Sequence, residues 1–442
     1  MTEPVYGRLD DPPATFVLVG GRVIDPSTGA DAIRDIAVRD GRIVDGVPEW
    51  SERIDARGLI VAPGLCDLHA HLRQPGDSAA ETIESGSRAA ARGGYTTICA
   101  MPNTDPPVDS PAAVARPSAD VSCRVRVIGA ATVGRAGRAP SELAAMADAG
   151  AVAFSDDGAA VGGDVASAVL ASLAGLGVPL IEHAEDPALA SGTVMREGPA
   201  ATRLGLAGWP ASAEQAVVER DLDLAAEAGA RLHFTHLSTA SALESVRAAR
   251  GRGVAVTCDV TPHHLAMTDD WVAGSRRYAW ETPEPNEARA YDATCRVNPP
   301  LATREDALAL LAGVADGSVD AIATDHAPHP TERKLVPFGE AAPGLIGLET
   351  ALSLGLAAVE AGLLGLPVLV AAMSTRPAAI IGERRGLGVG ETVDLVAFDP
   401  EARWTVEADG LASRSSNTPL LGMELPGVVR LTVADGRVTY RS

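Results

Sequence analysis

Two histidines separated by one residue form the strongest chemical signal of the chain, in the segment Asp67-Leu-His-Ala-His-Leu-Arg73. The segment follows a β-rich run, and alternate side chains of a strand point to the same face, so we expect His69 and His71 to project together. Neutral imidazoles are good ligands for zinc, and this pattern therefore favours a metal site. For this motif alone, the alternative is two unrelated histidines, one of them in a loop.

Other potential ligands follow other predicted strands. His183 stands in Ile-Glu-His-Ala-Glu, and Asp325 stands in Ala-Thr-Asp-His-Ala-Pro-His. His233 and His236 end a further strand, and their odd spacing predicts opposite faces, with His236 as the ligand and His233 packed against helices. Each residue alone has a structural alternative, such as a core histidine or, for Asp325, a helix cap. Together they predict hydrolysis at a metal, because zinc lowers the pKa of bound water toward about 7 and polarises a carbonyl.

The elements that must position these residues alternate between short apolar strands and alanine-rich helical stretches. Eight strands are predicted, at 59–68, 96–101, 124–131, 151–154, 179–182, 231–235, 254–260 and 320–324. Eight β-then-α units fit a (β/α)₈ barrel, whose loops after the strands converge on one active site. The charged and proline-rich stretch 271–295 is predicted to be an insertion or a long active-site loop. The apolar stretch 352–373 is predicted to be a buried helix of the barrel.

Both ends of the chain are rich in short β elements and Asp-Gly turns, as at Asp40-Gly41 and Asp435-Gly436. The predicted fold class is therefore α/β, a TIM-like (β/α)₈ metal-dependent hydrolase barrel with a small β-sandwich built from both termini. The predicted division places the N-terminal part of the sandwich at 1–62, the catalytic barrel at 63–375 and the C-terminal part of the sandwich at 376–442.

Composition excludes several classes of protein. The 37 Lys and Arg residues face 58 Asp and Glu, and the net charge of -21 argues against binding to nucleic acid or to anionic membrane surfaces. The sequence has no uninterrupted apolar run of the ~20 residues that a membrane-spanning helix needs, and its start has no signal-peptide pattern. The 5 cysteines are scattered without a C-x-x-C pair, which predicts reduced thiols and a cytoplasmic protein.

The combined motifs resemble the amidohydrolase superfamily and, more closely, the class I dihydroorotases, the bacterial long form. The matching stretches lie at 67–76, 100–104, 154–158, 260–265, 298–300 and 323–329. The resemblance implies one or two Zn²⁺ ions, with the ligands His69, His71, Asp157, His183, His236 and Asp325. It also implies the activity, a reversible cyclisation of N-carbamoyl-L-aspartate to L-dihydroorotate plus water in the synthesis of pyrimidines.

A single lysine bears on the ligand that bridges two metals. Many relatives bridge them with a carboxylated lysine after the fourth strand, but the only lysine of this chain, Lys334, lies beyond the eighth. The Ser-Asp-Asp-Gly motif offers Asp156 or Asp157 instead. We favour Asp157 and keep Asp156 as the alternative, in which case the other aspartate is a turn residue or supports the ligands.

The resemblance also implies how substrate is held. A substrate carboxylate needs a cationic cradle, and Arg73, two residues after His71, offers a bidentate fork. The implied substrate-binding residues are His71, Arg73, Asn103, Asn298, His329, Pro343 and Gly344. The implied catalytic residue is Asp325, which takes a proton from water and returns it to the leaving nitrogen. We also expect a homo-oligomer, and aspartate transcarbamoylase is a candidate partner.

Two alternative functions remain at this point. A hydantoinase, dihydropyrimidinase or allantoinase shares the fold, although such enzymes generally use the lysine bridge that is impossible here. A non-catalytic dihydroorotase-like scaffold subunit is expected to lack ligands, whereas every position is filled. The adjacent His263 and His264 are predicted to be one structural histidine and one that supports the ligands.

Overall fold

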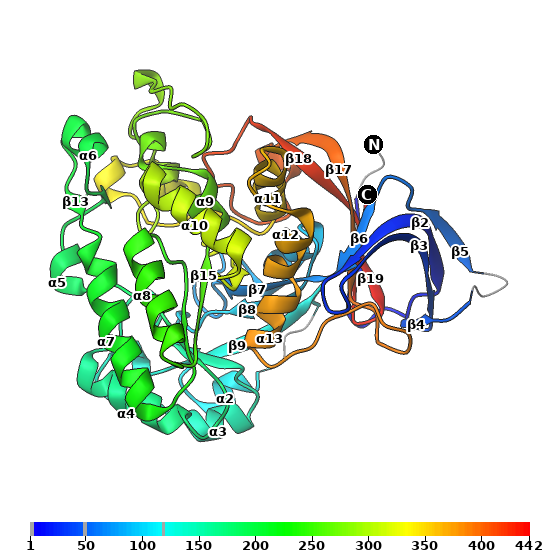
Figure 1. The fold of residues 1–442 in the computed structure, drawn as a ribbon, viewed down its shortest axis with the longest axis horizontal. Helices are drawn as coiled ribbons and strands as arrows, with labels where there is room; N and C mark the ends of the chain where they lie inside the picture. Colours follow the sequence, from blue (N-terminus) through cyan, green and yellow to red (C-terminus); the bar gives the residue numbers. More distant parts are fainter. Residues whose placement is uncertain (1–3, 47–50, 117–119) are drawn as a thin grey trace.

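An eight-stranded parallel sheet forms the barrel in the computed structural model, which describes residues 4–46, 51–116 and 120–442 (Figure 1). Its strands are β7 (Leu65–Ala70), β8 (Tyr95–Ala100), β9 (Arg124–Ala130), β10 (Ala153–Ser155), β11 (Leu180–Glu182), β14 (Leu232–Phe234), β15 (Val256–Val260) and β16 (Ala321–Ile322). Consecutive members of this series pair in parallel, so the predicted order of strands is confirmed.

The barrel closes at the end where the predicted ligands lie. β7 and β16 form no ladder, but an isolated parallel bridge joins Ala70 to His326. The His71 amide donates to the His326 carbonyl at 2.8 Å. The first and last barrel strands therefore meet through the residues that follow them, which brings the His69–His71 segment against Asp325.

Helices cover the outside of the barrel. They include α1 (Ile83–Arg92), α2 (Pro111–Val114), α3 (Leu143–Asp148), α4 (Gly163–Leu173), α7 (Ser212–Ala228), α8 (Ala240–Gly251), α10 (Arg304–Asp316), α11 (Ala351–Glu360), α12 (Leu366–Met373) and α13 (Thr375–Ile380). Side-chain caps start several of them: the Thr239 hydroxyl accepts from the Ala242 amide and the Thr303 hydroxyl from the Asp306 amide. Their apolar faces pack on outward-facing strand residues such as Phe234.

The prediction of one helix at 352–373 is wrong, because α11 and α12 divide this stretch. Gly362 lies between them with φ +73°, a left-handed conformation that favours glycine and ends a helix. Pro367 then occupies the first turn of α12, where its missing amide hydrogen costs nothing. Apolar character alone did not show where the backbone turns.

Two segments extend the loops after the strands. The first follows β11 and contains α5 (Pro187–Ala190), β12 (Met195–Arg196), α6 (Pro199–Leu204) and β13 (Gly208–Trp209). The second follows β15, with α9 (Pro262–Ala266) and the 3-10 turns Asp269–Trp271, Glu287–Arg289 and Ala293–Cys295. Trp271, at the start of the predicted insertion, is fully buried and belongs to the same core cluster as Met195. The two segments therefore pack on each other.

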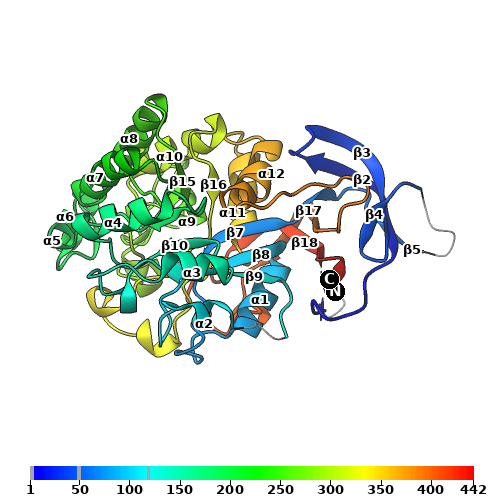
Figure 2. The same cartoon turned by 90° about the horizontal axis from the view of Figure 1, so that it is seen from below.

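A second sheet comes from both ends of the chain, as predicted. Its order is β1-β19-β18-β17-β6-β2-β3-β4, with β5 on β2. Its strands are β1 (Val5–Tyr6), β2 (Phe16–Asp25), β3 (Ala30–Arg39), β4 (Arg42–Val44), β5 (Glu52–Asp55), β6 (Ile60–Pro63), β17 (Leu395–Thr405), β18 (Glu424–Ala434) and β19 (Arg437–Arg441). All nine belong to one hydrogen-bonded sheet that curves around its own core (Figure 2). The predicted sandwich is thus one folded sheet, and parts of its N-terminal segment (1–3, 47–50) lie outside the described residues.

The predicted strand 59–68 is two strands of different sheets. β6 pairs with β17 and β2, whereas β7 pairs with β8. Gly64 stands between them, and a Cβ there would lie 2.3 Å from a Thr96 side-chain carbon, so a glycine allows the close approach. The domain limits 1–62, 63–375 and 376–442 stay predictions.

Two expectations from composition can be compared with the structure. All five cysteines are buried and free. Among the described residues, no helix has the length and apolar character needed to cross a membrane.

Candidate active site

The predicted metal ligands converge at the carboxyl ends of the barrel strands. His69 lies in β7 and His71 directly after it, while the others follow β10, β11, β14 and β16. All are buried, with exposed fractions of 6% or less, and they are His69, His71, Asp157, His183, His236 and Asp325. Residues far apart in sequence thus meet because each strand ends at the same rim of the barrel.

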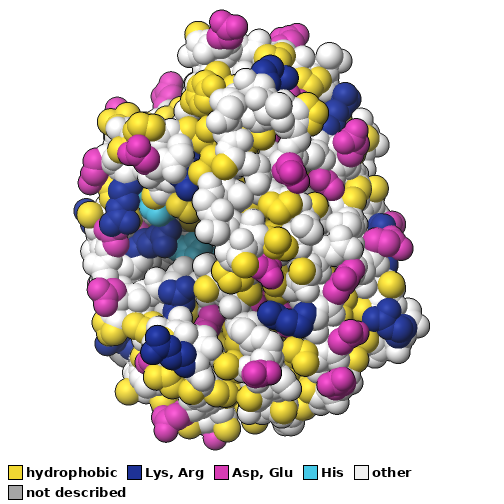
Figure 3. Space-filling model, turned by 90° about the vertical axis from the view of Figure 1, so that its left-hand side faces the viewer, with side chains coloured by type: hydrophobic (Ala, Val, Ile, Leu, Met, Phe, Trp, Pro, Cys, Tyr) yellow, Lys and Arg dark blue, Asp and Glu magenta, His cyan; other side chains and the backbone are white. Residues whose placement is uncertain are grey.

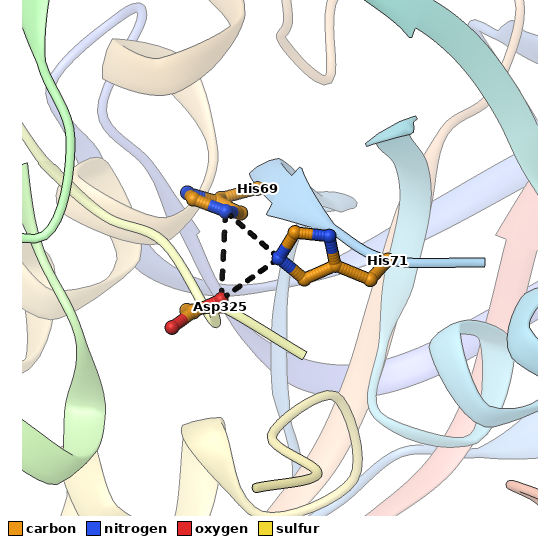
Figure 4. Close-up of side chains that lie close together, drawn as sticks. All are labelled: His69, His71 and Asp325. Carbon is orange, nitrogen blue, oxygen red and sulfur yellow. Dashed lines mark hydrogen bonds and ion pairs between the residues drawn. The ribbon is translucent and has the colours of Figure 1, made fainter. Parts of the chain in front are cut away.

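One group contains both histidines of the H-x-H motif (Figure 4). The Nε2 atoms of His69 and His71 lie 3.2 Å apart. Asp325 Oδ1 lies 3.4 Å from His69 Nε2 and 3.2 Å from His71 Nε2. The three side chains therefore direct one ligand atom each toward a common point.

The Asp157 carboxylate joins this group to a second one. Its Oδ1 lies 3.4 Å from His69 Nε2, 3.6 Å from His183 Nδ1 and 3.7 Å from His236 Nε2. Its Oδ2 lies 3.5 Å from His71 Nε2. Within the second group, His183 Nδ1 and His236 Nε2 are 2.9 Å apart. One carboxylate between two groups of imidazoles has the placement of a bridging ligand.

Asp156 points away from the ligands. Its Oδ1 accepts from the Thr132 amide at 3.0 Å, and its Oδ2 accepts from the Thr132 hydroxyl. The Arg135 guanidinium donates to the carbonyls of Asp156 and Asp157, which fixes the main chain of the motif. The structure therefore brings Asp157 and not Asp156 to the histidines. Lys334 is far from any such role, since its amine donates to the carbonyls of Ala293 and Arg296 at 3.1 Å.

The residues fit a metal ion. Asp157 Oδ1 is buried and has no hydrogen-bond partner among the described residues, a costly arrangement for a carboxylate unless a cation meets it. Two overlapping sets of ligand atoms, one with Asp325 and one with Asp157, each lie within 4.8 Å of one another. Imidazole nitrogens with carboxylate oxygens are a ligand set typical of catalytic zinc.

The charge balance of the cluster favours the ligating forms. Burial raises the pKa of Asp157, but the imidazoles of His69, His183 and His236 outweigh this and hold that pKa well below its usual range. Burial likewise raises the pKa of Asp325, and His69 and His71 again bring it below its usual value. Both aspartates are therefore carboxylates at neutral pH, which is the form that binds metal.

Left-handed backbone conformations set the direction of several site residues. Non-glycine residues with positive φ include Arg73 (φ 56°), His236 (φ 41°) and Asp325 (φ 45°). Such conformations cost energy for residues with a Cβ and persist only where surrounding contacts hold them. Their presence at three predicted site positions indicates that the loops are held for function.

The prediction that His233 packs against helices is wrong. Its Nε2 donates to Asp259 Oδ2 at 2.8 Å, and its Nδ1 lies 2.8 Å from the Thr257 hydroxyl. β14 ends at Phe234, and the positive φ of His236 breaks the alternation. His233 and His236 therefore both contact the polar interior of the barrel, although their spacing is odd.

The adjacent histidines after β15 have different surroundings, and the supporting role predicted for one of them stays a prediction. His264 is structural, since its Nδ1 lies 2.8 Å from the Thr261 hydroxyl and its Nε2 donates to the Pro299 carbonyl at 3.0 Å. His263 is buried with no partner for its Nε2 in the described part of the chain. Burial lowers the pKa of His263 to about 4, so this imidazole is neutral at neutral pH.

Arg73 and Asn103 both lie beside the ligands, but they differ in how many of their polar atoms already have hydrogen-bond partners. Arg73 Nε donates to the Pro328 carbonyl at 3.2 Å, and its two terminal nitrogens have no hydrogen-bond or ion-pair partner among the described residues. The amide of Asn103 is engaged at both ends: Oδ1 lies 2.8 Å from His71 Nδ1, and Nδ2 donates to Asp157 Oδ2 at 3.2 Å. Asn103 thus orients two predicted ligands, whereas Arg73 keeps its fork free.

The remaining predicted cradle residues are held by one another. His329 Nε2 donates to the Pro343 carbonyl at 2.8 Å, and the Gly344 amide donates to the Arg296 carbonyl at 2.8 Å. Gly344 has φ +125°, and a Cβ there would lie 2.6 Å from that of Ala327, so only glycine fits. Asn298 lies on the other side of the site, with Nδ2 3.4 Å from His183 Nε2.

The sequence interpretation missed several supporting residues. Asn417 accepts from the His329 amide and donates to the carbonyls of Ala327 and Gly344, which ties the cradle loops together. No local pattern around Asn417 indicated this. Asp259 lies under the ligands, and a signal for it existed, because it is a carboxylate near the end of the strand predicted at 254–260.

A hollow opens on the face of the molecule shown in Figure 3. Histidine side chains are visible inside it, and Lys or Arg side chains gather around it, although the whole chain carries a net charge of -21. A locally basic opening suits an anionic small molecule despite the overall acidity.

Comparisons with known proteins agree with this geometry. A family profile described as Dihydro-orotase-like matches residues 58–242. A dihydroorotase of Geobacter metallireducens is 44% identical over 437 residues, which cover 96% of this chain and 99% of the relative. A dihydroorotase of Mycobacterium tuberculosis is 44% identical over 424 residues, with 92% and 95% covered. An L-hydantoinase (dihydropyrimidinase) structure from Arthrobacter aurescens has a TM-score of 0.82 at 26% identity and covers 96% of each chain.

The barrel and its strand-end histidine and aspartate groups define the class, an amidohydrolase-type enzyme that acts on cyclic amides. The similarity over nearly the whole length of the relatives is more specific than the fold. The chain belongs to the dihydroorotase family.

Proposed function

We propose that this chain is a zinc-dependent dihydroorotase, which interconverts N-carbamoyl-L-aspartate and L-dihydroorotate plus water. The observation that carries the proposal is the placement of Asp157 between two groups of imidazoles, in a chain 44% identical to dihydroorotases over nearly its full length. The carboxylate takes the place that a modified lysine has in many hydantoinase-like relatives. Retention of every ligand argues against a non-catalytic scaffold.

Zinc, as one or two ions, is the proposed cofactor. His69, His71 and Asp325 would hold one ion, His183 and His236 a second, and Asp157 would contact both. When bound, zinc supplies Lewis acidity, which lowers the pKa of water and stabilises negative charge on a carbonyl oxygen. The nitrogen and oxygen ligand set supports zinc over magnesium or calcium, which prefer oxygen ligands alone.

Asp325 is the proposed group for proton transfer. Its Oδ1 lies close to His69 Nε2 and His71 Nε2, and its lowered pKa keeps it ionised at neutral pH, the form in which a carboxylate can accept a proton. In the hydrolytic direction, the oxygen of water bonds to the ring carbonyl carbon and Asp325 takes the proton that water loses. The ring C–N bond then breaks, and Asp325 gives this proton to the departing nitrogen. Ring closure is the same path reversed.

Arg73 is the proposed partner of the substrate carboxylate. Its free terminal nitrogens can form two parallel hydrogen bonds with a carboxylate, and burial makes such bonds stronger than at the surface. Burial lowers the pKa of His329, and the nearby Arg73 cation lowers it further, to about 3. The neutral His329 donates through Nε2 to Pro343, which leaves Nδ1 as an acceptor toward the substrate. Asn103, Asn298 and the main chain at Pro343 and Gly344 are proposed to shape the rest of this cradle.

A substrate comparison tests the proposal. The purified protein supplied with zinc should convert L-dihydroorotate to N-carbamoyl-L-aspartate, and should act far more slowly on dihydrouracil, hydantoin or allantoin. These last compounds lack the ring carboxylate that Arg73 would hold. Preferred turnover of dihydrouracil or hydantoin would instead support the alternative function, a hydantoinase or dihydropyrimidinase.

Other properties are proposed on the resemblance to class I dihydroorotases. They are a homo-oligomeric state, a cytoplasmic location, an association with aspartate transcarbamoylase, and no binding to nucleic acid or membranes. The net charge of -21 supports the last of these. Size-exclusion chromatography of the chain, alone and with the transcarbamoylase, tests the oligomer and the association.

A further inference from the structure

A buried carboxylate, Asp259, lies beneath the ligand cluster in the interior of the barrel. It is the second-last residue of β15, and none of its surface is exposed. It belongs to neither predicted ligand group, and its nearest partners are protein donors. The contacts of its Oδ1 lead to predicted ligands on two different strands, His69 of β7 and His236 after β14.

One contact reaches His69 through a hydroxyl. His69 Nδ1 lies 2.8 Å from Thr235 Oγ1, and Thr235 Oγ1 lies 3.3 Å from Asp259 Oδ1. His69 directs its other nitrogen, Nε2, at Asp157 and Asp325. A neutral imidazole that ligates through Nε2 carries its proton on Nδ1, so Nδ1 donates to Thr235. The Thr235 hydroxyl then has one proton left, and it donates this proton to Asp259.

A second contact reaches His236 through the main chain. The His236 amide donates to Asp259 Oδ1 at 2.6 Å. His236 has φ 41°, a strained conformation for a residue with a Cβ, and the adjacent Leu237 amide donates to the Asp259 carbonyl at 3.0 Å. Asp259 thus holds the turn that carries His236 back to the site.

The other oxygen of Asp259 is held in place by a third group. His233 Nε2 donates to Asp259 Oδ2 at 2.8 Å, and Thr257 Oγ1 lies 2.8 Å from His233 Nδ1 on the far side. His233 therefore orients the carboxylate, and its own contact with Thr257 does not lead to any ligand. This gives two threonines that each bond one side of the Asp259 network: the buried Thr235, which lies between Asp259 and His69, and the half-buried Thr257, which lies behind His233 and touches no ligand.

We propose that Asp259 is a positioning residue that orients His69 through the Thr235 hydroxyl and His236 through its main-chain amide. This inference rests on the proposed function only in taking His69 and His236 as metal ligands. Hydrogen bonds of this kind fix the proton position and the ring orientation of a ligating imidazole, and a carboxylate at their end raises its basicity. The expected consequence is tighter metal binding and, through it, a higher kcat.

The central test compares Thr235→Val with Thr257→Val. Valine keeps the shape of threonine but removes the hydroxyl, so each variant loses one link of similar size. Zinc affinity is measured by competition with a chromophoric chelator, which needs no substrate. We expect Thr235→Val to weaken zinc binding by about 10- to 100-fold, the usual effect of losing a partner of a metal-ligating histidine. Thr257→Val should remain within about threefold of the unchanged protein, since its hydroxyl leads to no ligand.

Two further variants separate orientation from simple packing. Thr235→Ser restores the hydroxyl without the methyl group and should recover most of the zinc affinity that Thr235→Val loses. Asp259→Asn keeps the shape but offers one acceptor oxygen where three donors converge, and should weaken zinc binding at least as much as Thr235→Val. If Asp259→Asn does not fold, the threonine variants carry the test alone.

Kinetics with L-dihydroorotate add a second readout. Thr235→Val should lower kcat at limiting zinc and leave KM nearly unchanged, because the cradle around Arg73 is not touched. Zinc affinity in Thr235→Val equal to that of Thr257→Val would overturn the proposal, as would a Thr235→Ser variant no better than Thr235→Val. If the unchanged protein fails to turn over dihydroorotate but the affinities differ as expected, the proposed function fails and the positioning role stands.

Discussion

The metal-ligand cluster and the substrate cradle lie side by side but are held in different ways. The cluster consists of side chains at strand ends that are directed at common points, and Asp157 Oδ1 in it is buried without a hydrogen-bond partner in the described part of the chain. The cradle consists of loops whose polar groups mostly satisfy one another, as where His329 donates to Pro343 and Asn417 ties Ala327 to Gly344. Arg73 is the exception, because its two terminal nitrogens have no partner among the residues that the structure describes.

This difference indicates where specificity and reactivity reside. A cluster fixed by the barrel can serve many cyclic amides, because strand ends are rigid and common to the fold. A cradle built from loops can differ between enzymes without disturbing the cluster. Changes in the cluster should therefore abolish turnover or metal binding, whereas changes in the cradle should mainly alter KM and substrate preference.

The largest effect is expected from Asp325→Ala. Loss of the group that moves the proton should lower kcat by about 10²- to 10⁴-fold, the usual contribution of general acid–base catalysis. Asp325→Asn keeps the shape and serves as the matched variant. Initial rates of dihydroorotate hydrolysis measure the effect. A variant with more than a tenth of the original kcat would contradict the assigned role.

Asp157→Ala and Asp156→Ala should separate the two aspartates of the motif. Asp157→Ala removes the carboxylate between the two imidazole groups and should lower the metal content measured after dialysis by about one ion per chain, where two are bound. Asp156→Ala should retain metal but lose stability by about 1–3 kcal/mol, because the Thr132 amide and hydroxyl lose their buried acceptor. Equal metal content in both variants would contradict the bridging role.

Arg73→Lys tests the free fork of the cradle. Lysine keeps the positive charge but cannot form two parallel hydrogen bonds with a carboxylate, so KM for dihydroorotate should rise by about 10-fold or more. Metal content should not change, because Arg73 contacts no predicted ligand atom. Dihydrouracil, which lacks the carboxylate, is the control substrate, and its KM should be insensitive to the substitution. An equal rise for both substrates would show that Arg73 acts on the site as a whole.

The smallest effect concerns acid stability. Burial holds the pKa of His263 at about 4, below the usual histidine value of 6.5. The unfolded chain therefore binds a proton between these values that the folded chain excludes. Stability is full above pH 6.5 and falls as the pH is lowered toward 4.

The proposed His263→Gln variant should show a shallower loss of stability over this range. Urea unfolding at pH 7 and pH 5 measures the difference between it and the unchanged protein. His236→Gln is not a suitable control, because it removes a predicted ligand. All nine histidines of the chain are buried, so no exposed histidine can serve as a control. The unchanged protein and His263→Gln are therefore each compared at the two pH values. A parallel pH dependence in both proteins would show that His263 does not contribute.

Much of the barrel was predictable because its signals are local. The eight strands are short apolar runs, and the chemistry-bearing residues follow them at positions where a parallel barrel gathers side chains. Errors arose where backbone turns decide the outcome. The stretch at 59–68 crosses from one sheet to the other at Gly64, and the stretch at 352–373 turns at Gly362. The chain is apolar on both sides of each turn, so hydrophobicity does not mark the turn.

The site shows the same limit. Strand alternation placed His233 on the face opposite to His236, on the assumption that the strand continues through both. The strand ends at Phe234, and the left-handed conformation of His236 turns its side chain to the same interior as His233. The position of Asp259 near a strand end could be noticed in the sequence, but its contacts and those of Asn417 join residues from distant parts of the chain, and no spacing indicates them.

The sequence by itself determined which residue types were present to do chemistry and in what order the strands deliver them. With Lys334 as the only lysine, beyond the eighth predicted strand, it also excluded a modified lysine after the fourth. Only the tertiary structure decided that Asp157 faces the histidines while Asp156 binds Thr132, and that Asp259 holds two predicted ligands from beneath. The physical reason is that residue type fixes which bonds a side chain can form, whereas its direction depends on backbone conformation and on the neighbours that complete those bonds.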